Sequence, residues 1–380
     1  MRLGEYKKWA PVVLMLAGMM VTSCGEDDNG PNAGDNFDQK GLLEHVGSSL
    51  IVPAYQELEQ KSGILRDKIS SFIASPESST LEEAKTALFE ARIAWQYCSP
   101  YQFGPAEESG LASNLNIFPA DRSKIERNIE NGSYNLGTLA NNDAKGFAAL
   151  EYLLYGKDVT SGEVIQGFAD QPQRATYLQN VAELIIATAA EVYAAWSPDG
   201  GNYLGEFTSD GALGADAGSS LGKLVNALNL SFERNTRDAK IGIPAGIRSL
   251  GITIPEATEA YYAGYSLELA LANVDAYKKL FLGQTREGVK GLGFDDYLKA
   301  RKAATTSGSE LPLDEAINAQ FDAVLGFIDQ IENPLDEQIR TDNSRVQQVF
   351  AQMQQLAVLL KTDMASALGV VISYQDNDGD

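Results

Sequence analysis

Gly146-Phe147-Ala148-Ala149-Leu150-Glu151-Tyr152-Leu153-Leu154-Tyr155-Gly156 is an apolar stretch that is bounded by glycine and carries one carboxylate. The stretch predicts a helix, on which the side chains three or four positions from Glu151 share its face and are mostly apolar. Burying an unpaired carboxylate is costly, so Glu151 must find a donor or a cation, or hold its proton. The plain interpretation is a core glutamate bridged to an arginine or a tyrosine without any ligand, because structural ion pairs also bury acids.

The rest of the chain also has helical periodicity. Apolar residues recur at helical spacing over residues 42–73, 84–95, 125–129, 174–196, 221–232, 256–282, 294–304, 313–331 and 344–368. Alternation typical of a strand is confined to residues 370–374. We therefore predict an all-α fold of two up-and-down helical bundles, in which the second repeats the architecture of the first by duplication.

Local signals predict where several helices begin, bend or end. Pro53 should kink or divide the first helix. Thr80-Leu81-Glu82-Glu83 has the form of a capping box, and Asp121 is placed to cap a short helix. Asn141-Asn142-Asp143 is expected to cap the Glu151 helix, and Gly156 is expected to end it.

The N-terminus predicts an exported lipoprotein. Basic residues precede a short apolar run from Val12 to Val21, which is too short to span a membrane and is typical of a signal peptide. Val21-Thr22-Ser23-Cys24 resembles a bacterial lipobox, so we expect residues 1–23 to be removed and Cys24 to be acylated. Gly25-Glu26-Asp27-Asp28 resembles an acidic tag for the outer-membrane surface, although a solvated tether has the same composition. We expect a lipid-anchored outer-membrane protein. It is displayed at the cell surface if the acidic stretch acts as a sorting signal.

Composition divides the remaining chain. Residues 24–39 are rich in Gly, Asn, Asp and Pro and predict a flexible tether. The glycine-rich stretch from Pro198 to Gly218 predicts a boundary between an N-terminal bundle, 40–199, and a C-terminal bundle, 217–380. With Cys24 acylated, Cys98 has no intramolecular disulfide partner. The net charge of −22 argues against nucleic acid or an anionic bilayer surface as a partner.

The Glu151 stretch resembles the helix motif of the imelysin-like family, G-x-H-x-x-E followed by two leucines and a glycine. Gly146 and Glu151 match the motif, whereas Ala148 stands at the histidine position. The other stretches that resemble the family in order are Ile51-Val52-Pro53-Ala54-Tyr55, Ala94-Trp95, Gly242-Ile243-Pro244, Tyr265-Ser266-Leu267, Leu368-Gly369-Val370 and Asp378-Gly379-Asp380. The resemblance implies two four-helix-bundle domains with a site where they meet, and either a metallopeptidase activity or a non-peptidase binding role in iron uptake.

The residues argue against hydrolysis. A zinc peptidase of the H-E-x-x-H type needs two imidazoles one turn apart, and His45 is the only histidine of the chain. With Ala148 in the motif, a two-residue metal clamp on that helix cannot form. Gly218-Ser219-Ser220-Leu221-Gly222 spells G-x-S-x-G, but a nucleophile elbow must follow a strand, and a glycine-rich linker precedes it. No phosphate-binding loop is present in the sequence.

Carboxylates and phenols remain as ligands for a hard cation such as Fe³⁺ or Ca²⁺. Tyrosines and acids crowd the segment predicted as one helix from Glu256 to Leu282, and bundle-core packing of these tyrosines is the alternative interpretation. The residues expected to bind in a groove between the bundles are Glu151, Gly146, Trp95, Tyr101, Phe103, Glu259, Tyr265 and Ser266, and the metal candidates are Glu151 and His45.

The function expected from these observations is a non-catalytic binding protein in iron or haem acquisition, or one that holds another oxygen-coordinated cation. Its expected partners are an outer-membrane transporter or an iron-source protein. Two alternatives stay open: a metallopeptidase that uses His45 with carboxylates, and a surface scaffold that docks a partner protein and binds no small ligand.

Overall fold

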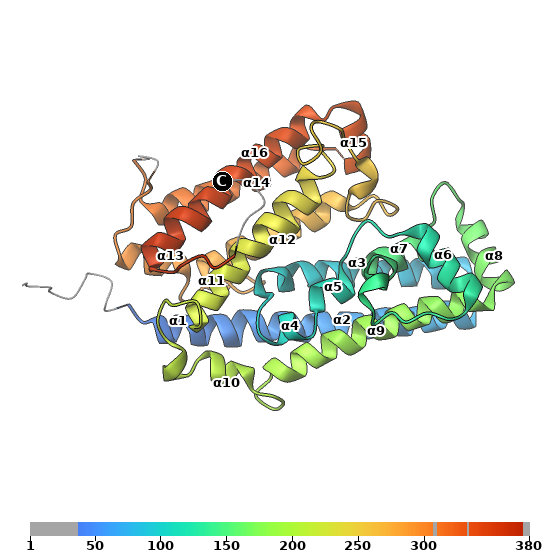
Figure 1. The fold of residues 1–380 in the computed structure, drawn as a ribbon, viewed down its shortest axis with the longest axis horizontal. Coiled ribbons are helices and arrows are strands. Elements are labelled where there is room, and N and C mark those ends of the chain that lie inside the picture. Colours follow the sequence, from blue (N-terminus) through green and yellow to red (C-terminus); the bar gives the residue numbers. More distant parts are fainter. Residues whose placement is uncertain (1–36, 307–309, 333, 375–380) are drawn as a thin grey trace, which may run out of the picture.

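The protein is described by a computed structural model, which covers residues 37–306, 310–332 and 334–374 (Figure 1). Over these ranges the chain is helical and contains no strand, so the all-α prediction is confirmed. Two isolated antiparallel bridges join Gln284 to Lys290 and Ala304 to Pro312. Residues 370–374, the candidate strand, form none. The predicted signal peptide, Cys24, most of the predicted tether and the acidic tail lie outside the described residues.

The first half of the chain is built on three long helices. α2 (Val52–Ala74) packs against both α3 (Ser78–Cys98) and α9 (Pro172–Trp196). Shorter elements cover these helices: α1 (Gln39–His45), η1 (Val46–Ile51), η2 (Ser99–Tyr101), α4 (Pro105–Glu108), α5 (Leu111–Leu115), α6 (Arg122–Asn131), η3 (Leu139–Ala144), α7 (Gly146–Tyr155) and α8 (Ser161–Asp170). Of these, α7 lies against α3 and α9, so it closes the first half on the side of the later helices.

The second half is built around α12 (Ser266–Leu282), α14 (Leu313–Asp329) and α16 (Ser344–Val358). α14 packs against α12 and α16, and α16 packs against the π-helical η5 (Phe232–Gly242). The other elements are α10 (Tyr203–Phe207), η4 (Asp210–Ala212), α11 (Ser220–Ser231), η6 (Pro255–Ala257), α13 (Phe294–Ala300), α15 (Leu335–Thr341), η7 (Leu359–Met364) and α17 (Ala365–Leu368).

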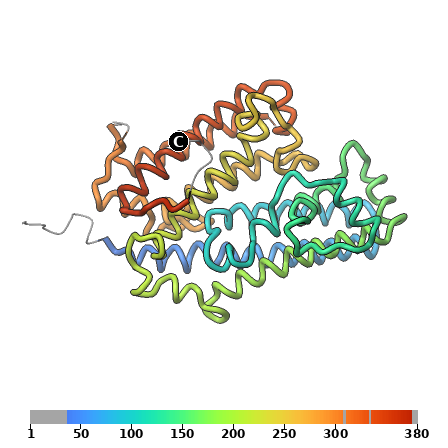
Figure 2. The backbone as a smooth tube through the Cα atoms, viewed as in Figure 1, coloured from blue at the N-terminus to red at the C-terminus, as the bar shows by residue number. Residues whose placement is uncertain are grey.

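The two halves lie side by side along the long axis of the molecule, as the tube in Figure 2 shows. They meet where α12 packs against α3. The division of the chain into two bundles near residues 200–216, and their origin by duplication, stay predictions. None of the helices in the described ranges combines the length and the apolar character needed to cross a bilayer.

Pro53 does not divide the first helix, but the helix changes form beside it. The helical run from Gln39 to Ala74 is unbroken, but its backbone widens to π-helix over Val46–Ile51, directly before the proline. Proline lacks an N–H and its ring crowds the carbonyl one turn earlier, and a wider turn relieves that crowding. The Val52 N–H accordingly donates to the carbonyl of Gly47, five residues earlier.

Of the helix ends for which the sequence predicts a capping or stop residue, two are confirmed and two are wrong. Asp121 caps α6 by accepting from the Lys124 N–H, and Gly156 ends α7 at φ 67°. The capping residue of α3 is Glu77, so Thr80 lies inside the first turn instead of before it. Residues 141–143 belong to the 3₁₀ turn η3, and Lys145 precedes α7 without a side-chain cap.

The third error is the largest, because it concerns the predicted helix 256–282. Only Ser266–Leu282 is α-helical, and residues 258–265 form an irregular loop, which we call the clasp loop. Glu259, Tyr261 and Tyr262 therefore lie on a loop and not on a tyrosine-rich helix. The chain passes through left-handed backbone at Ala260, φ 58°, and at Gly264, φ 79°, which a continuous helix excludes.

Candidate functional site

Glu151 is buried in an ion pair. Its Oε2 lies 2.5 Å from Nη1 of Arg92, and the two side chains are 2% and 0% exposed. The other oxygen, Oε1, accepts from the backbone N–H groups of Tyr262 at 2.6 Å and Ala263 at 2.9 Å. Both carboxylate oxygens are therefore engaged, in the way that the plain interpretation of the sequence describes: a core acid bridged to an arginine.

The clasp loop provides the two N–H groups because it does not continue as a helix. In a helix, successive N–H groups point along the axis toward earlier carbonyls. Here the left-handed turn at Ala260 redirects the chain, and the next N–H groups converge on one carboxylate, as in other anion-binding turns. The acid of α7 is thus held by the first half through Arg92 and by the second half through the loop backbone.

A second buried acid, Glu259, lies beside the first. Its carboxylate pairs with the ammonium of Lys240 and accepts from Asn116 at 3.0 Å and Gln96 at 3.2 Å. Nη2 of Arg92 is 3.9 Å away. Burial alone would raise the pKa of Glu259, but the charges of Lys240 and Arg92 outweigh burial and hold its pKa below the ordinary value.

Lys240 completes the cluster with a second contact to Gln96, whose Oε1 accepts from Nζ at 2.9 Å. Burial lowers the pKa of Lys240, because desolvation disfavours the ammonium, and the charge of Glu259 opposes that effect. Two acids and two cations give a neutral group of fully desolvated charges. We call Arg92, Glu151, Lys240 and Glu259 the buried charge cluster.

Four elements that are distant in sequence supply the cluster. Arg92 and Gln96 lie one turn apart on α3, so their side chains share the face turned toward α12 and the clasp loop. Glu151 comes from α7, Lys240 from η5 and Glu259 from the clasp loop. The cluster therefore lies where the first half contacts the second.

Sequence reasoning missed Arg92, Gln96, Lys240 and Asn116. A signal existed for Arg92, which lies four residues after Leu88 and three before Trp95, on the apolar stripe of its helix. A cation on an apolar stripe is a candidate partner for a buried acid. The sequence around the other three provides no comparable signal.

Tyr265 and Ser266, both predicted site residues, support the cluster. The Arg92 guanidinium lies 5.6 Å from the centre of the Tyr265 ring, within cation–π range. Burial raises the pKa of the Tyr265 phenol above its ordinary value. The Ser266 hydroxyl donates to the backbone carbonyl of Glu259 and so ties the start of α12 to the clasp loop.

Gly146 starts α7 in a conformation that favours glycine. Its φ is 72°, and an added Cβ would overlap the carbonyl group of Leu115. The motif glycine thus lets α7 approach the end of α5, which brings Glu151 next to α3. The neighbouring Ala148 is buried, with 5% of its surface exposed.

Trp95 lines a small cavity beside the cluster, with a volume of about 110 Å³. Gln96, Asn116 and Lys240 also face this cavity, and Ile117 lies on its wall. The Oδ1 atom of Asn116 is buried and has no hydrogen-bond partner among the described residues. The cavity therefore presents the Lys240 ammonium and neutral polar side chains, and no carboxylate of the described ranges lines it.

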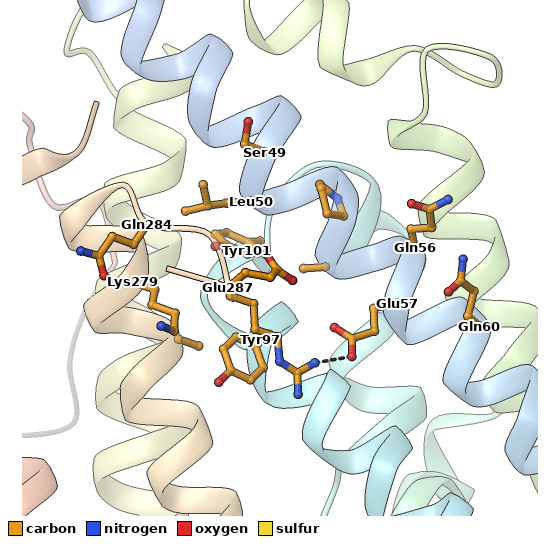
Figure 3. Close-up of a pocket in the computed structure, with 14 residues that line it drawn as sticks. Ser49, Leu50, Gln56, Glu57, Gln60, Tyr97, Tyr101, Lys279, Gln284 and Glu287 are labelled. Carbon is orange, nitrogen blue, oxygen red and sulfur yellow. Dashed lines mark hydrogen bonds and ion pairs between the residues drawn. The ribbon is translucent and has the colours of Figure 1, made fainter. Parts of the chain in front are cut away.

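Two predicted site residues lie elsewhere. Phe103 packs edge-on against Trp196, with ring centres 5.5 Å apart, and also against Phe207. Tyr101 accepts a hydrogen bond from the Tyr55 hydroxyl through its carbonyl oxygen, and its ring lines a different cavity (Figure 3). Trp95, Tyr101 and Phe103 are therefore not brought together at one cavity, because Pro100 and Pro105 turn the chain away after α3.

The residues considered for metal or nucleophilic chemistry are engaged in structural contacts. Nε2 of His45 lies 2.9 Å from the carbonyl oxygen of Gly283, in the second half of the chain. Within the described ranges, no group of three His, Cys, Asp or Glu side chains is arranged to hold a metal ion. Cys98 is buried, which raises the pKa of its thiol, and Ser220 begins α11 and follows no strand.

Known proteins resemble this chain in sequence and in fold. A family model described as imelysin matches residues 51–362. The curated iron-regulated protein A of Synechococcus elongatus is 26% identical over 116 residues, so the match spans 30% of this chain and 30% of that relative's length.

Two solved structures share the fold. A putative iron-regulated protein A precursor from Parabacteroides distasonis superposes with a TM-score of 0.69 at 19% identity, covering 87% of this chain and 94% of that one. An imelysin-like protein from Psychrobacter arcticum superposes with a TM-score of 0.65 at 17% identity, covering 88% and 96%. The fold and the extent of the family match lead to one conclusion: the chain belongs to the imelysin family.

Proposed function

We propose that this chain is a lipid-anchored, non-catalytic binding protein of the cell envelope that acts in iron or haem acquisition. Two similar proteins, one a relative by sequence and one by fold, bear the name iron-regulated protein A, which supports the link to iron. The predicted lipobox at Cys24 supports the envelope location.

The observation that carries the non-catalytic role is the state of Glu151. A metallopeptidase uses such a carboxylate as a general base on metal-bound water, or as a ligand of the metal. In this chain one oxygen is paired with Arg92 and the other accepts two backbone N–H groups. Freeing the acid for chemistry would leave Arg92 buried without its main partner, which is costly. We infer that Glu151 holds the two halves together.

The cavity beside the cluster is the ligand site that we propose for this role. Its volume of about 110 Å³ is well below the ~300–1,000 Å³ typical of sites for drug-sized ligands. A small iron species is therefore favoured over haem. The Lys240 ammonium and the absence of a carboxylate from the described lining suit iron that is held by an anionic chelator rather than a bare cation.

The experiment compares a deletion strain with its parent under iron limitation, on ferric citrate and on haem as iron sources. We expect iron starvation to induce the gene and the deletion to slow growth on at least one source. Unchanged expression, together with parental growth on both sources, would refute the role in iron acquisition.

The site is tested separately, by thermal unfolding of the mature chain with and without each iron species. Ile117→Trp is the control variant, because Ile117 lines the cavity and is 37% exposed, so a larger side chain can block the cavity without touching the buried charges. Stabilisation that survives in this variant would place the ligand elsewhere.

The anchor and the peptidase alternative have direct tests. Cys24→Ser should abolish incorporation of labelled palmitate and release the protein from the membrane fraction, and retention of both would refute lipidation. Chelator-sensitive cleavage of an unfolded substrate, lost in His45→Ala, would restore the peptidase hypothesis.

One surface favours the scaffold role as the second candidate function. The turn between η5 and η6 exposes Leu250 fully and Ile252 by 70%, in a loop held by backbone hydrogen bonds from Gly251 and Ile254. Contiguous exposed apolar residues mark protein interaction sites. Leu250→Ser with Ile252→Ser should then slow growth on limiting iron without lowering thermal stability, and unimpaired growth would exclude this candidate.

A further inference from the structure

A second cavity lies at the junction of the two halves, away from the buried charge cluster (Figure 3). Its volume is about 270 Å³, and it is lined by η1, α2, the end of α3, α12 and the turn that follows α12. It shares no lining residue with the cavity beside Trp95. The family motif contributes nothing to it, so its chemistry must be derived from its own walls.

Two acids and two bases line this cavity, namely Glu57, Glu287, Lys279 and Arg286. Glu57 on α2 forms an ion pair with Arg286 in the turn after α12; Figure 3 draws this pair as the dashed line at Glu57. The Arg286 guanidinium is stacked over the ring of Tyr97 at 4.4 Å from its centre. The Tyr97 hydroxyl donates to Asp275 at 2.8 Å, which fixes the ring. The cation is therefore held in place by a stacked ring as well as by its partner.

The uncharged lining residues include aliphatic and amide side chains. Leu50, Ala54 and Ala276 provide aliphatic surface, and the side chains of Gln56 and Gln60 add donors and acceptors. The π-helical segment η1 brings Leu50 into the wall, and such segments are frequent at binding sites.

The charge arrangement selects between ligand classes. An anion would be attracted by the two bases of the lining but repelled by its two acids, and a cation would meet the reverse. A ligand that carries both charges can pair with an acid and with a base of the lining at the same time. The pair between Glu57 and Arg286 costs little to open, because the two side chains are 31% and 35% exposed and such pairs contribute only ~0–1 kcal/mol.

We propose that this cavity binds a free α-amino acid in its zwitterionic form. The ligand ammonium pairs with Glu57, and the ligand carboxylate pairs with the guanidinium of Arg286, which suits two parallel hydrogen bonds. The ligand side chain lies on the surface formed by Leu50, Ala54 and Ala276. A volume of about 270 Å³ corresponds to about nine water molecules, which accommodates an amino acid of ordinary size. The proposal does not depend on the role in iron acquisition.

The test is calorimetric titration of the mature chain with the twenty free L-amino acids. For the best ligand, the matching amine without the carboxylate and the matching acid without the amine are titrated in parallel. We expect at least one amino acid to bind saturably, with a dissociation constant below 10 mM. Both single-charge analogues should bind at least tenfold more weakly. The proposal would be overturned if no amino acid binds with a dissociation constant below 10 mM, or if either analogue binds as tightly as the amino acid.

Variants then assign the site. Glu57→Gln and Arg286→Gln should each weaken binding at least tenfold, since each removes one charge from the cavity. Glu59→Gln is the matched control, because Glu59 lies on the same helix, carries the same charge and does not line the cavity. Thermal unfolding of each variant verifies that it is folded. Equal affinity of the folded Glu57→Gln variant and the parent would place the ligand elsewhere and overturn the assignment.

Discussion

Replacing Glu151 by glutamine tests whether the buried charge cluster holds the protein together. The substitution keeps the size of the side chain and removes one charge. An amide has a single acceptor oxygen, so it can serve either Arg92 or the N–H groups of Tyr262 and Ala263, but not both sides. Whichever way the amide is turned, at least one set of buried donors faces an NH₂ group.

The expected loss follows from the burial of the partners. Arg92 is 0% exposed, and removing one member of a buried pair leaves an uncompensated charge, which costs ~3–5 kcal/mol. Whole proteins unfold with only ~5–15 kcal/mol, so Glu151→Gln is expected to remove a large part of the stability. The double variant Arg92→Met with Glu151→Gln should recover ~2 kcal/mol of this loss, because the amide oxygen can then turn to the clasp loop without opposing a guanidinium.

The assay is urea unfolding of the mature chain, followed by circular dichroism. Glu83→Gln provides the matched control, because Glu83 pairs with Lys68 at 2.8 Å but is 53% exposed, and pairs of that kind contribute ~0–1 kcal/mol. If Glu151→Gln costs no more than this control, or if the double variant is less stable than the single one, then the cluster does not hold the halves together in the way we infer.

Three further substitutions test other parts of the site. Gly146→Ala should lower the free energy of unfolding in urea by ~2–4 kcal/mol, since the new Cβ overlaps the Leu115 carbonyl. Gly132→Ala, at a similar positive φ of 62° but in open space, should lower it by only ~1 kcal/mol. Equal losses in the two variants would contradict the overlap. Because the pKa of Glu259 is depressed, its stabilising contribution is present above the ordinary value of 4.5 and is lost as the pH falls through the folded-state pKa. Glu259→Gln should therefore flatten the decline of the unfolding free energy below about pH 4.5. An unchanged decline would argue against this contribution. Ala148→His should cost ~1–3 kcal/mol by overpacking a buried position and should bind no zinc in metal analysis, because Glu151 is already engaged; stoichiometric zinc would contradict this.

The long helices could be predicted from periodicity because their apolar faces are regular. The stretch 174–196 was expected to be helical, and α9 spans Pro172–Trp196. Caps were harder, because several residues can serve the same turn. Asp121 was identified correctly, whereas the three polar residues before the Glu151 helix looked like a cap and instead form a 3₁₀ turn that leads into Lys145.

The clasp loop could not be predicted from local sequence. Residues 256–265 hold Glu, Ala and Tyr with a helical pattern, and only Gly264 and the proline at 255 interrupt it. The loop is held by long-range contacts, since its N–H groups bind Glu151, which is 111 residues earlier. A sequence pattern records the periodicity of a segment but not the partner that its backbone will find.

The sequence predicted the kind of environment that surrounds Glu151 but not which residues form it. Its apolar neighbours on one helix face indicated a buried acid that needs a donor or a cation. The partner is Arg92, 59 residues away on α3, and the choice among the arginines of the chain depends on how α3 and α7 pack.

A buried charge cluster calls for an explanation, because well-packed apolar residues often provide equal or greater stability in the same space. Apolar contacts are not directional, so α7 could shift along α3 with little penalty. The contacts of Glu151 are directional: a shift of either oxygen by a fraction of a hydrogen-bond length leaves Arg92 or the clasp loop unpaired. The cluster thus fixes one relative position of the two halves, and both cavities at their junction owe their shapes to that position. It follows that a substitution that weakens the contacts of Glu151 should disturb ligand binding at the junction, even in a variant that remains folded.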